Sequence, residues 1–394
     1  MTTRVQLDPE ESRGDQSGTL RTQGLATPEA PLGVGIVGVS PERGWAATAH
    51  IPALRALPNY EIRALSARSP ESARALGEAF GVRAVLVDHE QMVSQPDIDL
   101  IAVTVKVPHH RELVTAALDA SKAVYCEWPL GRDLDDARAM AALAAERGVR
   151  TIVGLQGRQA PAIELVQRLL SDGYVGEVLS TTMIGLSIPG DVVVQPNAYM
   201  LDKRNGANAL TIAVGHSLDT LNYVLGEFAD LSAVSELRRP LITIGETGEQ
   251  IVKTAPDQIA LIGRLTSGVT ASIHIREAVA GGTGFLWEIN GTEGTLRVTA
   301  AAPYPGIVPL TVAGAHGAQD PTELAVPPAL TDRWPELTSL QGTPASNVGR
   351  AYAAFAADIG DGTHTVPDFA DAVRRHRVID AIESSADSGE RVRV

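Results

Sequence analysis

The sequence predicts an α/β protein, with an N-terminal domain built on a parallel sheet and a C-terminal α+β domain built on a mostly antiparallel sheet. Its 394 residues exceed one domain of about 150 residues. From Leu32, short apolar runs alternate with amphipathic helices, the pattern of βαβ units around a doubly wound sheet. After Thr151 strand-like segments follow one another, which favours antiparallel pairing. The predicted domains are residues 31–152 and 153–394.

Hydrophobic periodicity predicts the elements of the N-terminal domain. Residues 1–30 are mostly polar and carry almost no periodic apolar side chains, so they are predicted to be a flexible tail. Amphipathic periodicity predicts helices over residues 70–80, 110–120 and 134–147. Buried strands are predicted at the apolar runs Val34–Val39, Ile62–Leu65, Leu100–Val105 and Ala123–Cys126.

The C-terminal domain is predicted to contain helices over residues 160–172, 206–225, 347–359 and 370–385. Residues 303–343 are rich in Pro, Gly, Ala and Thr, which predicts a long surface excursion. Strands are predicted at Val178–Leu186, Leu231–Glu236, Gln258–Leu265, Val269–Ile275, Gly284–Asn290 and Thr295–Ala300.

Composition argues against several classes of function. A formal net charge of -14 would repel a phosphate backbone, so no nucleic-acid partner is expected. No apolar run approaches the roughly 20 residues of a membrane span, and the N-terminus does not resemble a secretory signal, so a cytoplasmic protein without membrane contact is expected. A single cysteine, Cys126, excludes an intrachain disulfide, and no metal-ligand spacing occurs, so no metal site is expected. The sequence contains neither a P-loop nor a nucleophile elbow.

The first predicted strand ends in a glycine turn that suits a dinucleotide. Gly38 is followed by an insertion, Ser40–Arg43, and then by Gly44, Trp45 and Ala47, which matches G-x-G-x-x-G/A apart from the insertion. Free backbone N–H groups at such a strand–turn–helix junction hold a pyrophosphate. These residues are therefore predicted to bind a dinucleotide, and a tight turn without a ligand is the alternative.

The end of the second predicted strand bears on the choice of cofactor. An acidic residue there normally accepts the ribose hydroxyls of NAD. Here that place holds Ala67, followed by Arg68 and Ser69. A guanidinium and a hydroxyl could pair with a 2′-phosphate, so the sequence favours NADP over NAD. The alternative is that Arg68 is an ordinary solvated cation.

Several motifs together resemble the Gfo/Idh/MocA family of oxidoreductases over the chain from Leu32 to the C-terminus. The resemblance implies a Rossmann domain, a second domain with a large open sheet, and hydride transfer between NAD(P) and a sugar, sugar nucleotide or cyclic polyol. Gly44-Trp45, Glu127-Trp128 and Leu155-Gln-Gly-Arg158 are most similar to the branch that contains the fungal galactose-regulon repressor. The family motifs are His50-Ile-Pro-Ala-Leu54, the stretch His110–Leu130, Gly215-His-Ser-Leu-Asp219 and Gly291-Thr-Glu-Gly-Thr-Leu296.

The sequence departs from the family at two catalytic positions. Family enzymes usually carry a lysine where this chain has Trp128, and an aspartate where it has Ile212. Neither side chain exchanges a proton near neutral pH. Of the three usual polar positions only His216 remains, four residues after Ile212. The resemblance therefore implies His216 as the acid or base, while Asp219 is expected to be structural.

Further residues are assigned by the resemblance. Val105 and Glu127 are expected beside the cofactor, with Glu127 contacting a ribose hydroxyl. The indole of Trp128 would stack on the nicotinamide or on a sugar ring. A purely structural tryptophan below Pro129 is the alternative.

The segment before the predicted His216 helix is expected to contact the substrate. Tyr199 and Asp202 could hydrogen-bond sugar hydroxyls, and Lys203 could replace the missing lysine. A polar surface loop is the alternative for this segment, and we favour it for Lys203.

Two functions remain open from the sequence. The first is a cytoplasmic NAD(P)-dependent oxidoreductase of a small carbohydrate-like substrate. The second is a non-catalytic dinucleotide-binding regulator that binds a protein partner. A homodimer or homotetramer is expected in either case, because the large open sheet would otherwise expose an apolar face.

Overall fold

The structure is a computed structural model of the chain, and it describes residues 30–40, 44–67, 69–82, 84–86, 89–187, 190–277 and 284–394. The tail predicted for residues 1–30 lies outside the described residues except for Ala30. Arg68, the residue expected to select the cofactor, lies outside them as well.

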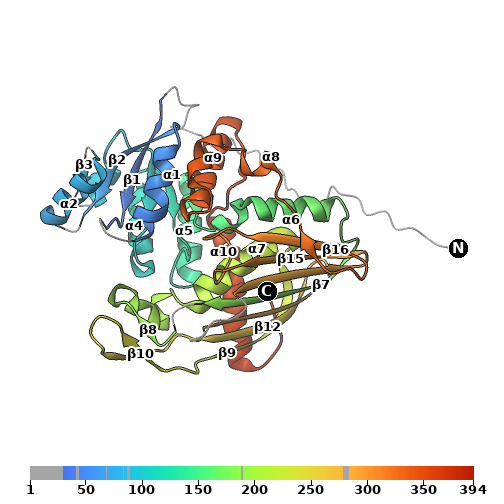
Figure 1. Cartoon of the computed structure of the whole chain (residues 1–394). Coiled ribbons are helices and arrows are strands. Elements are labelled where there is room, and N and C mark those ends of the chain that lie inside the picture. Colours follow the sequence, from blue (N-terminus) through green and yellow to red (C-terminus); the bar gives the residue numbers. More distant parts are fainter. Residues whose placement is uncertain are drawn as a thin grey trace.

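A six-stranded parallel sheet forms the N-terminal unit (Figure 1). Its strand order is β3-β2-β1-β4-β5-β6, and every pair is parallel. The chain leaves β1 toward β3 and returns to β4 on the other side of β1, which creates a switch point between β1 and β4. The predicted doubly wound fold is confirmed. The strands are β1 (Leu32–Val37), β2 (Tyr60–Ser66), β3 (Ala84–Leu86), β4 (Leu100–Val103), β5 (Ala123–Cys126) and β6 (Thr151–Val153).

Local signals define the helices of this unit. Ser69 caps α2 (Pro70–Phe80) in a reciprocal capping box with Ser72. Asp133 caps α5 (Leu134–Arg147), which ends at a left-handed Gly148. The remaining helices are the π-helix η1 (Ala46–His50), α1 (Ile51–Ala56), α3 (His89–Val93), the 3-10 helix η2 (Val107–His109) and α4 (His110–Asp119).

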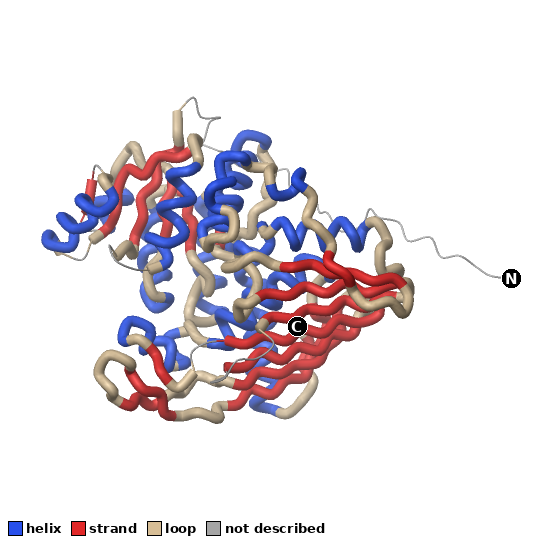
Figure 2. Tube along the Cα trace, in the orientation of Figure 1, coloured by secondary structure: helices blue, strands red, loops and turns tan. Residues whose placement is uncertain are grey.

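A nine-stranded sheet dominates the C-terminal unit, in the order β17-β16-β15-β14-β7-β13-β12-β9-β18. Figure 2 shows its strands side by side in red. Only β7 and β13 pair in parallel, so the predicted mostly antiparallel sheet is confirmed. The strands are β7 (Val178–Ser187), β9 (Phe228–Glu236), β12 (Gln258–Leu265), β13 (Thr270–Glu277), β14 (Phe285–Gly291), β15 (Gly294–Ala300), β16 (Thr311–His316), β17 (Thr322–Glu323) and β18 (Val392–Arg393).

Helices cover one face of this sheet, because inward side chains of its strands share a core with α6, α7 and α10. The other face is not covered by the described chain. The helical segments are the 3-10 helices η3 (Gln156–Gln159), η4 (Gln195–Leu201), η5 (Lys203–Asn205) and η7 (Pro335–Leu340), the π-helix η6 (Ala209–Val214), and α6 (Pro161–Ser171), α7 (Gly215–Leu225), α8 (Pro328–Thr331), α9 (Ala345–Asp361) and α10 (Phe369–Ser388).

The C-terminal unit differs from the sequence-based expectations in residues 303–343 and in a second, small sheet. Residues 303–343 are not only a surface excursion, because β16 and β17 extend the large sheet and Leu330 and Leu337 are buried. A second sheet of β8 (Val192–Val193), β10 (Leu241–Ile244) and β11 (Gln250–Val252) was not expected. These strands are too short to show a clear alternating pattern.

Helix α9 lies late in the chain but packs on the N-terminal unit, beside α1 (Figure 1). Val348, Tyr352 and Phe355 of α9 share a core with Ile51 and Leu54 of α1. The last part of the chain therefore helps to hold the two units together.

Candidate functional site

The glycine turn lies at the switch point. Gly38 follows β1 with a φ of +104°, and a Cβ there would come within 2.7 Å of the Thr104 carbonyl carbon and 2.8 Å of the Val105 nitrogen. Only glycine allows the loops after β1 and β4 to approach this closely. Gly44 also has a positive φ, +110°, but a Cβ on it would meet no described atom within 4 Å.

The helix that follows the turn begins at this same edge. Trp45 is the N-cap of η1, and η1 runs directly into α1. Trp45 is half-buried, and its indole Nε1 is buried without a partner in the described chain, while Ala47 is half-buried on the first turn. A close backbone turn leading into a helix end fits a pyrophosphate, so these residues suit a dinucleotide.

The residues at the end of β2 bear on the choice between NAD and NADP. Ala67 is buried in the place where an acidic residue would select NAD. The hydroxyl of Ser69 accepts a hydrogen bond from the Ser72 backbone N–H at 3.2 Å, so it caps α2. Ser69 is still half-buried near the helix end. Arg68 lies outside the described residues.

Glu127 follows β5 and starts a buried hydrogen-bonded chain. Its Oε1 lies 2.8 Å from His50 Nε2, and His50 Nδ1 lies 2.7 Å from the Tyr352 hydroxyl. The carboxyl ends of β4 and β5 are adjacent, since Val103 pairs with Cys126. His50 and α9 therefore fix Glu127 at the edge where Val105 and the glycine turn also lie.

Trp128 is packed inside the molecule, with only 5% of its surface exposed. Its Nε1 donates to the Thr211 carbonyl at 2.8 Å, its ring lies 4.8 Å from the ring of His376, and a Cβ on Gly215 would collide with the indole. This packing supports the structural alternative. It leaves little of the indole for a nicotinamide or a sugar.

His216 is buried at the first turn of α7 and stacks on Tyr304, with ring centroids 4.6 Å apart. Burial lowers the pKa of His216 to about 3, and it raises the pKa of Tyr304 to about 12. Both rings are therefore uncharged at pH 7. His216 Nδ1 is buried and has no hydrogen-bond partner among the described residues. A neutral imidazole with a free nitrogen can accept a proton, although so low a pKa makes it a weak base.

The helix before His216 is not an α-helix. Residues Ala209–Val214 form the π-helix η6, which changes the angular step between side chains. Ile212 therefore lies on the π-helix η6, and His216 lies on the first turn of α7.

Asp219 lies one turn beyond His216, and its carboxylate is engaged in ion pairs. Its two oxygens accept hydrogen bonds from Arg158 at 2.5 and 2.8 Å, and Arg158 also pairs with Asp371 at 3.0 Å. Arg375 Nε lies 3.6 Å from the same aspartate. The Leu155–Arg158 motif thus contributes Arg158 to a buried network of ion pairs.

The three polar residues expected to bind substrate have different surroundings. Tyr199 is half-buried on η4, and the ammonium of Lys106 lies 4.6 Å from the centre of its ring. Asp202 caps η5 and pairs with Arg204 at 2.6 Å, and these hydrogen bonds lower its pKa to about 2. Lys203 lines a pocket with Glu383 of α10, so its placement does not support a role as the missing lysine.

The structure thus brings Gly38, Val105 and Glu127 together at the carboxyl edge of the parallel sheet. The charge of Glu127 contributes to the raised pKa of Tyr304. Sequence reasoning did not identify Tyr304, Lys106 or Tyr352 as site residues. Lys106 was detectable in principle, because it directly follows a predicted strand at its carboxyl end. Tyr304 and Tyr352 gave no comparable signal.

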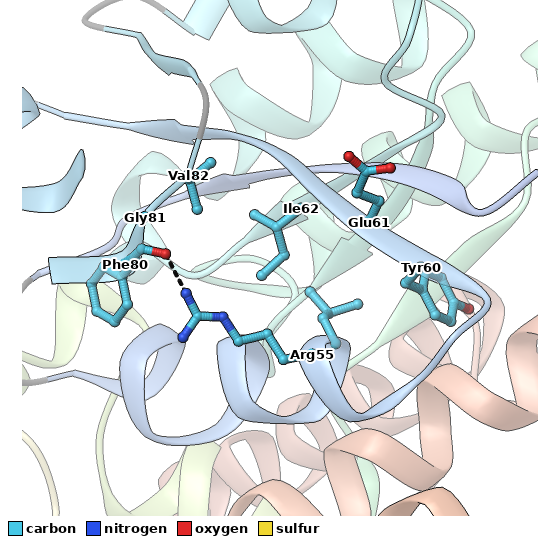
Figure 3. A pocket seen from close by; sticks show the side chains of 8 residues that line it. Arg55, Tyr60, Glu61, Ile62, Phe80, Gly81 and Val82 are labelled. Atoms are coloured by element: carbon cyan, nitrogen blue, oxygen red, sulfur yellow. Dashed lines mark hydrogen bonds between the residues drawn. The ribbon is translucent and has the colours of Figure 1, made fainter. Parts of the chain in front are cut away.

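A surface cavity of about 440 Å³ lies elsewhere (Figure 3). It is lined by Tyr60, Glu61 and Ile62, the first residues of β2, and by Arg55, which donates a hydrogen bond to the Phe80 carbonyl. It therefore lies toward the amino ends of the strands. Dinucleotides bind at the carboxyl ends, so this cavity is not part of the candidate site.

Two negative findings concern the described residues alone. None of their helices is long and apolar enough to cross a membrane. Nor do three His, Cys, Asp or Glu side chains gather in this part of the chain in a way that could hold a metal ion.

The chain matches two known domain families. Residues 32–155 match the oxidoreductase family with an NAD-binding Rossmann fold, Gfo/Idh/MocA, and residues 161–300 match the C-terminal domain of Gal80p. A dehydrogenase of Aspergillus oryzae, aclE, is 33% identical over 343 residues, which are 84% of this chain and 88% of that protein. The predicted family resemblance is confirmed.

Solved structures share the fold over nearly the whole chain. A super-repressor mutant of Gal80p from Saccharomyces cerevisiae is 25% identical, with a TM-score of 0.81 over 93% of this chain and 98% of that chain. Levoglucosan dehydrogenase in complex with NADH and levoglucosan is 23% identical, with a TM-score of 0.80 over 92% of this chain and 99% of that one. The fold therefore occurs both in a dehydrogenase and in a repressor.

Proposed function

Since the chain belongs to the Gfo/Idh/MocA family of NAD-binding oxidoreductases, we propose that it is an NAD(P)-dependent oxidoreductase of a sugar, sugar nucleotide or cyclic polyol. The observation that carries this proposal is the close approach of Gly38 to the loop after β4 at the switch point. When bound, the nicotinamide would exchange a hydride with a carbinol carbon of the substrate. The relatives named as dehydrogenases support the same reaction class.

The proposed cofactor residues surround the carboxyl edge of the parallel sheet. The glycine turn would hold the pyrophosphate, and the end of β2 would hold the adenosine ribose. NADP in preference to NAD is proposed because Ala67 supplies no carboxylate there. The proposed set is Gly38, Gly44, Trp45, Ala47, Arg68, Ser69, Val105, Glu127 and Trp128, with Trp128 acting through packing rather than through its face.

The proposed proton acceptor is His216. Oxidation of an alcohol needs a base within reach of the hydroxyl proton. The His216 imidazole is uncharged, and its Nδ1 has no hydrogen-bond partner among the described residues. Because its pKa is about 3, protonation of His216 should not limit turnover between pH 5 and 8. Tyr199 and Asp202 are proposed as substrate contacts, and the half-buried Tyr199 is the better placed of the two.

Turnover tests the proposed function directly. The purified protein is incubated with a panel of sugars and cyclic polyols and with either NAD or NADP, and reduction is followed by nicotinamide absorbance. We expect turnover of at least one alcohol, with NADP the more efficient cofactor. Tight binding of both dinucleotides without any turnover would contradict the enzyme, and equal efficiency with NAD would contradict the cofactor preference.

The His216→Asn variant tests the proposed base. It should retain cofactor binding but lose about 10²-fold or more in kcat on the best alcohol of the panel, the usual effect of removing a positioned base. Calorimetry with NADPH serves as the control for an intact cofactor site. A variant that turns over at the parental rate would show that another group takes the proton.

The uncovered face of the large sheet supports the proposed homodimer or homotetramer. The pairing registers align Val234, Ala260, His274, Ile184 and Leu286 in one row across five strands on this face. Val234 is 56% exposed and the neighbouring Ile262 is 62% exposed, and such side chains are usually covered in an assembly. Light scattering should report at least twice the mass of the chain at micromolar concentration. A monomer would contradict this expectation.

The alternative function is a regulator that binds a dinucleotide and a protein partner without catalysis. The burial of Trp128 favours the regulator. Trp128 replaces the usual lysine, and its enclosed indole can neither exchange a proton nor reach a ligand. The likeness to Gal80p supports it as well. The absence of turnover together with retained dinucleotide binding would favour this alternative.

A further inference from the structure

Lys106 lies beside the switch point of the parallel sheet. It follows β4 at the carboxyl edge, directly after Thr104 and Val105, the two residues whose backbone packs against Gly38. Its own backbone is extended, and it occupies the N-cap position of the short helix η2 without a capping hydrogen bond from its side chain. Side chains in this position border the crevice where a dinucleotide and its reaction partner meet.

The ammonium of Lys106 reaches across to the C-terminal unit. It lies 4.6 Å from the centre of the Tyr199 ring on η4, within the range of a cation–π contact. Both side chains are half-buried. The contact therefore joins the carboxyl edge of the parallel sheet to the segment that precedes the His216 helix.

Lys106 is unusual among the cations near this edge, because it has no ion pair with any carboxylate of the described residues. Arg132 pairs with Asp136, and Arg158 pairs with Asp219 and Asp371. A half-buried ammonium without a counter-ion can pair with negative charge that a ligand supplies.

Trp128, His216 and Tyr304 cannot supply a positive charge to the site at pH 7. The Trp128 N–H is occupied by the Thr211 carbonyl, and His216 and Tyr304 are uncharged at pH 7. During oxidation of an alcohol, negative charge develops on the carbinol oxygen as its proton leaves. A fixed cation next to that oxygen stabilises this charge.

We propose that Lys106 is the cation that contacts the reacting oxygen of the substrate, and that the ring of Tyr199 holds its ammonium in place. The proposal rests on the oxidoreductase function given above. Lys106 keeps its own protons throughout and only donates a hydrogen bond to the oxygen. The proton of the hydroxyl still passes to a separate base.

The position of the ammonium favours the substrate over the cofactor. A pyrophosphate would lie on the turn between Gly38 and Ala47, whereas the Lys106 side chain already contacts the C-terminal unit through Tyr199. The main alternative is that Lys106 binds the phosphates of the cofactor. The variants described next distinguish substrate binding from cofactor binding.

The test compares Lys106→Met with Lys106→Arg and with the matched control Lys122→Met. Lys122 is also half-buried, but it precedes β5 at the opposite edge and donates to the Gln95 carbonyl at 2.9 Å. Three quantities are measured: the Kd of NADPH by calorimetry, the affinity of the best alcohol for the NADPH-loaded protein, and kcat/KM. The second quantity reports binding in a complex that cannot react.

Lys106→Met should lower kcat/KM by about 10²-fold or more, as for other losses of a donor to a developing oxyanion. The affinity of the alcohol should fall about tenfold, the equivalent of about 1.4 kcal/mol, while the Kd of NADPH stays unchanged. Lys106→Arg should restore part of both losses, and Lys122→Met should match the parent. An unchanged melting temperature would show that the variants are folded.

In addition to its proposed contact with the substrate, Tyr199 is proposed as a positioning residue for Lys106, and its ring should contribute more than its hydroxyl. Tyr199→Leu should lower the affinity of the alcohol and kcat/KM, and Tyr199→Phe should restore most of both. Equal losses in Tyr199→Phe and Tyr199→Leu would overturn this role.

The outcomes that overturn the proposal differ from those that overturn the enzyme. Weaker NADPH binding with unchanged alcohol binding would assign Lys106 to the cofactor, and unchanged kinetics of Lys106→Met would remove it from the site. In both cases the oxidoreductase itself stands. A parent protein that neither turns over nor binds any alcohol of the panel would overturn the proposed function and the role of Lys106 together.

Discussion

Gly38→Ala should severely weaken dinucleotide binding. A Cβ would stand 2.7 to 2.9 Å from three backbone atoms of Thr104 and Val105, closer than side chains approach backbone atoms, and the φ of +104° disfavours any side chain. The loops after β1 and β4 must move apart to admit it. Because the proposed pyrophosphate contacts are backbone N–H groups, each worth about 1.5–3 kcal/mol to a charged ligand, the affinity for NADPH should fall by about 10²-fold or more.

The matched control for this variant is Gly44→Ala. Gly44 shares the positive φ, at +110°, but a Cβ on it meets no described atom within 4 Å. Its cost is the backbone conformation alone, about 1–2 kcal/mol for a residue in a left-handed region. Calorimetry should therefore show a smaller loss of affinity than for Gly38→Ala. Equal losses in the two variants would mean that close packing at the switch point does not shape the cofactor site.

Asp219→Ala should destabilise the C-terminal unit severely. Asp219 is 1% exposed and accepts two hydrogen bonds from Arg158, and Arg375 lies beside the same carboxylate with 1% exposure. Removal of the carboxylate leaves two guanidinium groups buried with less negative charge around them. Loss of one partner from a buried ion pair costs about 3–5 kcal/mol, so the urea midpoint and the melting temperature should both fall markedly.

Asp202→Ala is the control for the loss of a carboxylate. Asp202 pairs with Arg204 at the surface, where the ion pair is solvated. Its unfolding midpoint, followed by circular dichroism, should stay close to that of the parent. If Asp219→Ala unfolded at the same midpoint as Asp202→Ala, the buried charges would not stabilise this fold.

The strands and the site of the glycine turn could be predicted because they depend on neighbours in the sequence. The β1 run from Leu32 to Val37 is fully buried, and its continuous apolar pattern indicates a strand covered on both faces. The large sheet shows alternation instead, as in β13, where buried and exposed side chains follow one another. The short edge strand β17 escaped prediction because two residues carry no periodicity.

The surroundings of the candidate site residues could not be predicted in the same way. Trp128 had two possible uses in sequence, and only the carbonyl of Thr211, together with Gly215 and His376, shows that its indole is enclosed. The pKa of His216 depends on its burial against Tyr304, a residue far along the chain. Ile212 lies on a π-helix, whereas the sequence predicted one continuous helix over residues 206–225.

The sequence by itself determined the fold class, the positions of most of the long strands along the chain, the glycine turn and the loss of the usual lysine and aspartate. These follow from residue type and short-range periodicity. Only the tertiary structure decided that Lys106 contacts Tyr199 and that Glu127 is held by His50. It also decided that His50 is hydrogen-bonded to Tyr352 of α9, which lies 302 positions further along the sequence. The physical reason is that burial, pKa and ion pairing depend on which distant segments pack together, and periodicity carries no information about such partners.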